Sequence, residues 1–285
     1  GTDPRTDIKI ENKAGATIDI SGEKAFGIYT EQANATNNGI IKITGSKNDA
    51  IGLRAKKLGT AQQTLANNAD INILSTGSRN MGLYTDSAII SNTGKINITA
   101  GENIGMVADG TGTGTNTGKI TATSDGSIGT ISRGTGTMTN TGIITVTGGN
   151  SVNNKGTVGV IAGAGSTNNN SGGTVVATVN GDKSIGAYSA GTLKLGTSTI
   201  TANNGAINYF SDDTSGNIEI ASGKTSTAIT GDKSLLFYTG GNGTGRFNVA
   251  GTLNATIQNG GTAFYYTPGT TTSNGSVTGY NNSLN

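Results

Sequence analysis

The chain contains no cysteine, no histidine and no tryptophan. Composition alone therefore excludes disulfide bonds, thiol proteases, histidine-dependent triads and the usual zinc sites. The lack of cysteine also suits a chain that crosses a periplasm, because no disulfide can form during export. We expect no metal and no cofactor.

Proline and aromatic residues are scarce, whereas glycine is abundant: 285 residues include 2 Pro, 48 Gly and 5% aromatics. A compact globular domain would lack the large side chains that normally fill its core. The 19 Lys plus Arg nearly balance the 17 Asp plus Glu, and these charges are scattered. Since nucleic-acid binding usually requires a clustered basic stripe with aromatic platforms, we expect no nucleic-acid partner.

No apolar run approaches the roughly 20 residues of a membrane-spanning helix, and no signal peptide is visible. The chain begins Gly-Thr-Asp-Pro without Met, so we expect an expressed or processed fragment whose targeting signal or anchor lies elsewhere. We predict a leader or vector-derived segment at 1–11, repeats at 12–268, and a C-terminal tail or linker at 269–285.

A single sequence repeat makes up nearly the whole chain. The segment that begins Asn92-Thr-Gly-Lys-Ile restarts at Asn116 and again at Asn140. The second half of the unit is an apolar residue, a glycine, and another apolar or small residue, with steps of 25, 30, 23, 24, 30 and 27 residues. The glycines are Gly27, Gly52, Gly82, Gly105, Gly129, Gly159 and Gly186. A period in the twenties without a leucine ladder predicts a β-solenoid.

Apolar residues alternate along two short segments of each unit, which is strand periodicity with one face in the core. Examples are Ile41/Ile43 and Ile96/Ile98 in the first segment, and Phe26/Ile28 and Ile104/Met106 in the second. Three further copies, at 206–210, 234–238 and 262–266, lack the glycine. We predict an all-β parallel β-helix of about ten coils with two strands per coil, about 50 Å long at about 4.8 Å per coil.

An Asn-x-Gly sequence recurs at one corner of the unit, at 37–39, 92–94, 116–118 and 140–142. Asparagine tolerates a left-handed backbone and glycine adopts it freely. Two interpretations stay open: the asparagines only form the turn, or their side chains also hydrogen-bond from coil to coil.

Two insertions interrupt the regular spacing, Arg54 to Ala66 and Gly148 to Gly156. Binding usually resides in loops on a rigid repeat scaffold, although a solvated loop without function is the competing interpretation. We expect the first to project beyond its coil, and the two to lie on different corners. The candidate ligand-binding residues are Arg54, Lys56, Lys57, Gln62, Gln63, Asn153, Asn154 and Lys155.

Nine of the thirteen aromatic residues fall between Tyr209 and Tyr280. We interpret them as large side chains that close or widen the end of the solenoid, because they keep the strand register. Stacking on sugar rings is the functional alternative.

Acidic residues do not mark a catalytic site. The only adjacent pair, Asp212-Asp213, lies in a turn-like run, and no acid recurs at a fixed position of the repeat. A polysaccharide-acting β-helix enzyme would use clustered carboxylates, so it is a minor alternative. We predict no catalytic residues and no enzyme activity.

The repeat resembles the passengers of large fusobacterial type V autotransporters, the RadD-like outer-membrane adhesins. The segments 22–29, Gly-Glu-Lys-Ala-Phe-Gly-Ile-Tyr, and 182–188, Asp-Lys-Ser-Ile-Gly-Ala-Tyr, carry the resemblance, together with Asn-x-Gly-x-Ile-x-Ile. It implies a right-handed parallel β-helix that a C-terminal outer-membrane β-barrel, absent here, exports to the bacterial cell surface. It also implies attachment to host cells or other bacteria through proteins or galactose-type sugars.

The sequence thus predicts a surface-exposed passenger segment that acts in adhesion, as a monomer, toward a surface protein or glycan. The competing prediction is a non-binding stalk that presents a distal binding domain.

Overall fold

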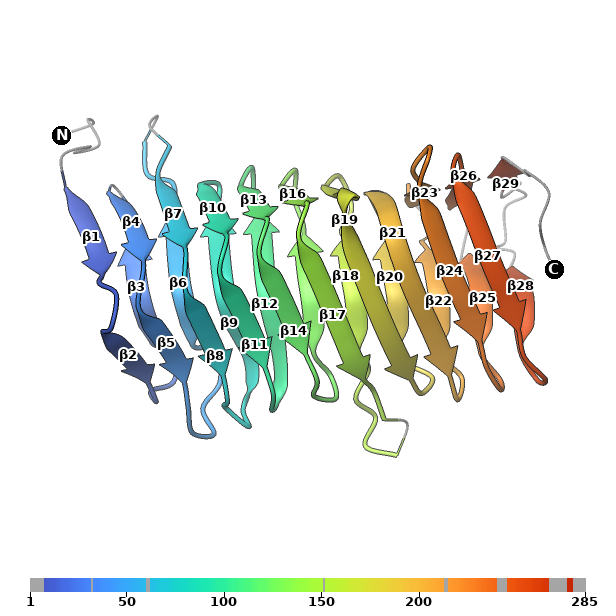
Figure 1. Cartoon of the computed structure of the whole chain (residues 1–285), viewed down its shortest axis with the longest axis horizontal. Helices are drawn as coiled ribbons and strands as arrows, with labels where there is room; N and C mark the ends of the chain where they lie inside the picture. Colours follow the sequence, from blue (N-terminus) through green and yellow to red (C-terminus); the bar gives the residue numbers. More distant parts are fainter. Residues whose placement is uncertain are drawn as a thin grey trace.

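The computed structural model describes residues 8–31, 33–59, 62–150, 152–212, 215–239, 245–266 and 276–278. Within them the chain is all strand and turn, wound into about ten coils that lie side by side from the N-terminal to the C-terminal end (Figure 1). All paired strands of neighbouring coils are parallel. The predicted parallel β-solenoid is confirmed, and its handedness stays a prediction. This part of the chain has no helix of the length and apolarity that a membrane span requires.

All but two of the coils contain three strands, so the prediction of two strands per coil is wrong for most of the solenoid. The first and second strands are separated by corner 1, the second and third by corner 2, and the third is joined to the next coil at corner 3. The missed strand is the one before Asn-x-Gly, such as Thr113-Gly-Thr-Asn116. Its inward positions hold Gly114 and Asn116, and therefore give no apolar alternation to detect.

The first strands are β1 (Lys9–Asn12), β4 (Asn34–Asn37), β7 (Thr64–Asn67), β10 (Ile89–Asn92), β13 (Thr113–Asn116), β16 (Thr137–Asn140), β23 (Asn217–Ile220), β26 (Arg246–Val249) and β29 (Ser276–Thr278). The second strands are β2 (Thr17–Ile20), β5 (Ile40–Ile43), β8 (Asp70–Ile73), β11 (Lys95–Ile98), β14 (Lys119–Ala122), β17 (Ile143–Gly148), β24 (Thr225–Thr230) and β27 (Thr252–Ile257). Two long strands, β19 (Thr167–Asn180) and β21 (Thr192–Asn203), span both positions. The third strands are β3 (Phe26–Thr30), β6 (Ile51–Lys56), β9 (Ser78–Asp86), β12 (Glu102–Asp109), β15 (Ile128–Ser132), β18 (Val158–Ala162), β20 (Ile185–Ser189), β22 (Ile207–Ser211), β25 (Leu235–Thr239) and β28 (Thr262–Tyr266).

The third strands form a ten-stranded sheet on one side of the coil. The first and second strands form two ladders on the other side, which β19 and β21 join into a 19-stranded sheet. Most of the predicted leader (1–11) and tail (269–285) lies outside the described residues.

The core is a thin stack of aliphatic side chains between the two sheets. On the second strands, the pairs Ile41/Ile43, Ile71/Ile73 and Ile96/Ile98 are at most 1% exposed and repeat in register from coil to coil. The sequence prediction of these inward pairs is confirmed. Because each layer covers only its neighbours, a thin core of Ile, Val, Leu and Ala is sufficient.

A glycine bulge reverses part of the predicted pattern on the third strands. The register omits the glycine, so that Ile104 pairs with Ile128 and Met106 pairs with Thr130. A side chain on Gly129 would stand 2.5 Å from the carbonyl oxygen of Gly159 in the next coil, so the coils approach too closely there for any Cβ. The prediction that both members of each apolar pair face the core is wrong, since Phe26 is 37% exposed and Ile28 only 5%.

The corner asparagines form a true ladder. In each rung the Nδ2 of one asparagine donates to the Oδ1 of the next at 2.7 Å, and all the side chains are buried. The ladder runs through Asn12, Asn37, Asn67, Asn92, Asn116 and Asn140. It stops at β19, whose register shifts after Asn170, and the following coils place Leu195 and Ile220 at the same position.

The C-terminal aromatic residues occur in two stacks. Tyr209, Phe237 and Phe247 are buried inside the last coils, with ring centroids 4.5 and 5.3 Å apart. Tyr188, Phe210, Tyr238 and Tyr265 follow one another on the outer face, 4.7 to 5.6 Å apart. Since the outer rings pack against one another in the strand register, they stabilise the stacked face, which favours the structural interpretation over sugar stacking.

Candidate ligand-binding edge

The first insertion is shorter than predicted. Arg54 and Lys56 lie in strand β6 and pair in register with Tyr84 and Asp86 of β9, so the loop begins only after Lys56. The prediction that the projecting segment starts at Arg54 is therefore wrong. The apolar-Gly-apolar strand simply continues by three residues with polar side chains on its outer face. Thr60 and Ala61 lie outside the described residues.

Arg54 is enclosed by aromatic rings rather than presented to a ligand. Its guanidinium carbon lies 5.0 Å from the ring centroid of Phe26, 5.2 Å from that of Tyr29 and 5.6 Å from that of Tyr84. Such cation–π contacts stabilise the stacked outer face, which is what an arginine between aromatic neighbours usually does.

The remaining predicted residues of this insertion are divided between surface and interior. Gln62 is exposed, whereas Gln63 is only 2% exposed and cannot meet a large ligand. The backbone amide of Lys57 donates to the carbonyl of Asp86 at 2.9 Å. Among the predicted residues of this insertion, Gln62 is therefore exposed and Lys56 and Lys57 are half-buried at corner 3.

The second insertion is a hairpin that projects from corner 2, at the opposite edge of the solenoid (Figure 1). Asn150 and Lys155 form an antiparallel bridge with N-to-O distances of 3.0 and 3.1 Å. Val152 at the tip is 90% exposed, and Asn153 and Asn154 beside it are exposed too. The predicted insertion between two strands, on another corner than the first, is confirmed. Ser151 lies outside the described residues.

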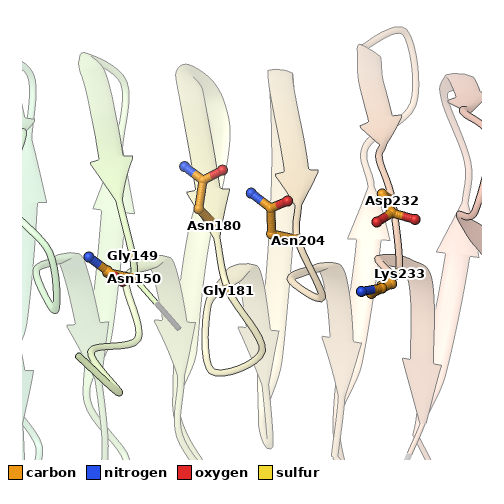
Figure 2. Close-up of a pocket in the computed structure, with 7 residues that line it drawn as sticks. All are labelled: Gly149, Asn150, Asn180, Gly181, Asn204, Asp232 and Lys233. Carbon is orange, nitrogen blue, oxygen red and sulfur yellow. The ribbon is translucent and has the colours of Figure 1, made fainter. Parts of the chain in front are cut away.

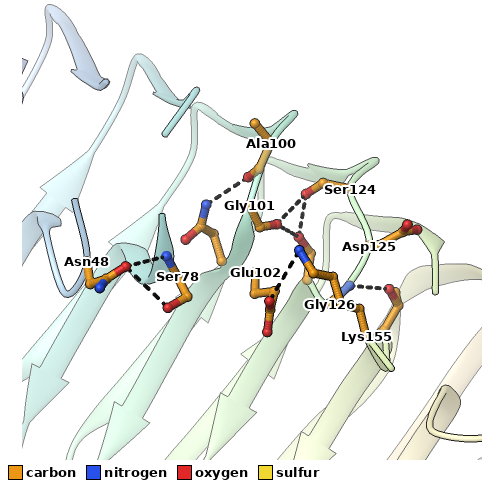
Figure 3. Close-up of polar contacts among 12 residues, drawn as sticks. Asn48, Ser78, Ala100, Gly101, Glu102, Ser124, Asp125, Gly126 and Lys155 are labelled. Atoms are coloured by element: carbon orange, nitrogen blue, oxygen red, sulfur yellow. Dashed lines mark hydrogen bonds and ion pairs between the residues drawn. The ribbon is translucent and has the colours of Figure 1, made fainter. Parts of the chain in front are cut away.

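Both sides of the hairpin base are tied to neighbouring coils. Lys155 Nζ lies 3.4 Å from Glu102 Oε1, as the close-up of this edge shows (Figure 3). The backbone amide of Gly149 donates to Asp125 Oδ1 at 2.9 Å. The hairpin is thus held at its base while its tip, with the predicted Asn153 and Asn154, faces solvent.

Polar contacts also fix corner 2 on the N-terminal side of the hairpin (Figure 3). The Ser78 amide donates to Asn48 Oδ1 at 2.8 Å, and the Ser124 hydroxyl donates to the Gly101 carbonyl at 2.8 Å. Arg79 pairs with Asp49 at 2.8 Å, and this hydrogen bond holds the pKa of Asp49 below its ordinary value. At this part of corner 2, the polar groups named above therefore have partners within the protein.

A polar groove of about 490 Å³ lies on the C-terminal side of the hairpin (Figure 2). Successive coils line it at corner 2, each with a turn residue after its second strand. The lining residues are Gly149, Asn150, Asn180, Gly181, Asn204, Asp232 and Lys233. Three amides, a carboxylate and an ammonium group provide both donors and acceptors, which suits a polar ligand.

Sequence reasoning missed this groove except for the hairpin next to it. The lining residues are ordinary turn residues of successive coils: Asn150, Asn180, Asn204 and Asp232 are separated by 30, 24 and 28 positions, and only the stacking of coils brings them together. The available signal was the recurrence of Asn-Gly and Asp-Lys at corner 2, as in Asn180-Gly-Asp-Lys183 and Gly231-Asp-Lys233.

The acidic residues considered for catalysis do not gather. Asp212 accepts a hydrogen bond from the hydroxyl of Tyr188, and Asp213 lies outside the described residues. Among the residues that the structure covers, no three or more His, Cys, Asp or Glu side chains come together as a metal site would require.

Comparison with known proteins gives one similarity. Residues 4–113 match the model of a family described as the BigA third pectate lyase-like domain, which is less than half of the chain. No curated protein and no solved structure matches the chain. The similarity agrees with the parallel β-solenoid and indicates a bacterial surface-associated protein.

Proposed function

We propose that the chain is a segment of an autotransporter passenger, displayed at the outer membrane, that acts in adhesion to host cells or other bacteria. Its partner is a surface protein or glycan, and the segment acts as a monomer without catalysis. The RadD-like resemblance of the repeats and the similarity to a BigA domain support the surface location.

The hairpin at 149–157 supports adhesion most directly. It places a 90% exposed valine and two exposed asparagines at the tip of an element whose base is fixed by Glu102 and Asp125. Binding residues usually lie on loops that a rigid scaffold holds in place, and this loop is both supported at its base and exposed at its tip. The contact is proposed to include Val152, Asn153 and Asn154, with the groove residues Asn180 and Asn204 next to them.

A non-binding stalk is the second candidate function. It is favoured by the uninterrupted aliphatic core and by the asparagine ladder, which continue from coil to coil and make a stiff spacer. A stalk needs no hairpin that projects from the coil and is held at its base, which is why we prefer adhesion.

Binding of the purified, labelled, monomeric protein to epithelial cells and to partner bacteria separates these two functions. Adhesion predicts saturable binding that excess unlabelled protein displaces. A folded protein that binds neither surface would contradict adhesion and leave the stalk. Turnover of a glycan or peptide by the same sample would contradict the absence of catalysis.

A further inference from the structure

A second groove, of about 610 Å³, runs along corner 1 from the third to the seventh coil. It lies between the first strands β7, β10, β13 and β16 and the second strands β8, β11, β14 and β17, on the sheet that faces the viewer in Figure 1. This groove is separate from the hairpin and from the polar groove at corner 2.

The floor of the corner-1 groove is backbone, because side chains do not fit there. A Cβ on Gly94, Gly118 or Gly142 would stand 2.1 Å from a carbonyl oxygen of the preceding coil. Close stacking therefore keeps this corner hollow in every coil that carries Asn-x-Gly.

The two walls repeat once per coil. Thr93, Thr117 and Thr141 form one wall, and Asp70, Lys95 and Lys119 stand on the other. Lys95 and Lys119 are register partners on adjacent strands, both exposed, and neither has an ion pair within the described part of the chain. Asp70 is the register partner of Lys95 on the other side, so this wall carries two ammonium groups and one carboxylate. Like charges directly opposite each other on neighbouring strands repel, so the Lys95–Lys119 end of the wall favours an anion.

The far end of the groove lies over the last asparagine of the ladder. Asn140 Nδ2, at the end of the asparagine ladder, is fully buried and has no acceptor among the described residues. It lies 2.5 Å from the place of a Cβ on Gly173, which lines the groove. Because this amide is buried beneath the groove floor, it does not contact a ligand in the groove, and recognition rests on the walls.

The chemistry of the walls limits the class of ligand. No aromatic side chain lines the groove, so there is no platform for nucleic-acid bases. Backbone amides of the floor, such as Gly94 and Gly118, already donate to Asn67 and Asn92, so a peptide cannot add as a strand. Ammonium and hydroxyl groups that recur at about the strand spacing of 4.8 Å fit a chain of hydroxyl-rich units with anionic groups.

We propose that the corner-1 groove binds a linear polysaccharide that carries carboxylate or sulfate groups. Lys95 and Lys119 contact the anionic groups, and the threonine hydroxyls contact the sugar hydroxyls. This site goes beyond the adhesive contact proposed above and does not depend on it, because it lies on another corner.

Immobilised hyaluronan, dextran sulfate and neutral dextran test the proposal with the purified protein. Hyaluronan offers carboxylates, dextran sulfate offers sulfates, and dextran offers neither. We expect binding to at least one of the two anionic polymers, weakening as salt screens the charges, and none to dextran. Which anionic polymer binds identifies the recognised group.

Variants of exposed residues locate the site. The double variant Lys95→Gln/Lys119→Gln is expected to bind about tenfold more weakly. Thr117→Trp, which fills the groove without changing charge, is expected to weaken binding as well. The control Lys13→Gln/Lys47→Gln removes the same charge from exposed positions outside the groove and should change affinity less than about twofold.

Three results would overturn the proposal. One is the lack of binding to both anionic polymers. Another is equal binding to dextran. The third is an equal loss in the groove variant and the Lys13/Lys47 control, which would mean general charge attraction.

Discussion

Replacing Asn92 with alanine should destabilise the solenoid by about 2–4 kcal/mol. Asn92 accepts from Asn67 and donates to Asn116, both at 2.7 Å, and all three side chains are fully buried. Its removal leaves Asn116 Oδ1 buried without its ladder donor, which costs about 1–3 kcal/mol. Asn67 Nδ2 keeps the Ala69 carbonyl at 2.8 Å, so only an ordinary hydrogen bond of about 1 kcal/mol is lost there.

Asn97→Ala is the matched control for this prediction. Asn97 lies in the same coil and donates to Asn72 at 2.9 Å, but both side chains are only half-buried. Asn97→Ala should lower the free energy of unfolding by less than about 1 kcal/mol, because water replaces the missing hydrogen-bond partner. Equilibrium urea unfolding followed by circular dichroism gives both free energies. A loss for Asn92→Ala no larger than for Asn97→Ala would refute the reasoning that the ladder holds the corner.

Three further predictions concern the core and the outer face. Burial raises the pKa of the Tyr209 hydroxyl from 10.0 to about 12. The stabilisation linked to this shift, about 2–3 kcal/mol of unfolding free energy, is complete below pH 10 and is lost as pH rises to 12. Tyr209→Phe should therefore flatten the fall in unfolding free energy between pH 9 and 12, and an unchanged slope would contradict this. Gly129→Ala should lower the free energy of unfolding by about 1–3 kcal/mol or more, because the new Cβ meets a carbonyl oxygen at 2.5 Å. The control Gly22→Ala places a Cβ that meets nothing closer than 3.4 Å, and it should be nearly neutral in the same urea experiment. Burial acts to raise the pKa of Asp109, yet the hydrogen bond from Arg133 brings this pKa below its ordinary value. The stabilisation from this pair is therefore present above the pKa of the unfolded state and is lost as pH falls through the pKa of the folded state. Arg133→Gln should reduce the acid sensitivity of unfolding, and identical acid unfolding profiles of the variant and the wild type would argue against this.

The number of coils was predictable because apolar pairs recur once per turn. The Ile96/Ile98 pair and its counterparts have a period of two and no competing interpretation, and they are the buried second strands. The first strands were missed because their inward positions hold small or polar residues such as Gly114 and Asn116. The sequence could not decide whether the asparagines form a ladder, because an asparagine that only forms a turn and one that also hydrogen-bonds to the next coil occur in the same sequence pattern.

Candidate binding residues were predicted from spacing alone, with mixed success. Extra length correctly located the hairpin around Asn153, since a longer step must leave the coil somewhere. The same reasoning placed Arg54 in a loop, although the strand continues through it and Phe26, Tyr29 and Tyr84 enclose it. The two grooves arise where recurring turn motifs of successive coils stack, so the sequence shows the motifs but not the space that stacking leaves between them.

Replacement of the hairpin tests most directly whether this solenoid carries an adhesive contact. Residues 149–157 are exchanged for the five residues Asn180-Gly-Asp-Lys-Ser184, which join the same two strand positions one coil later. After circular dichroism confirms the fold of both proteins, binding to cells and bacteria is compared with that of the wild type in the presence of excess dextran sulfate and hyaluronan, which would occupy the corner-1 groove. The account predicts that the shortened corner abolishes saturable binding. Full binding by a folded hairpin-less protein would contradict it.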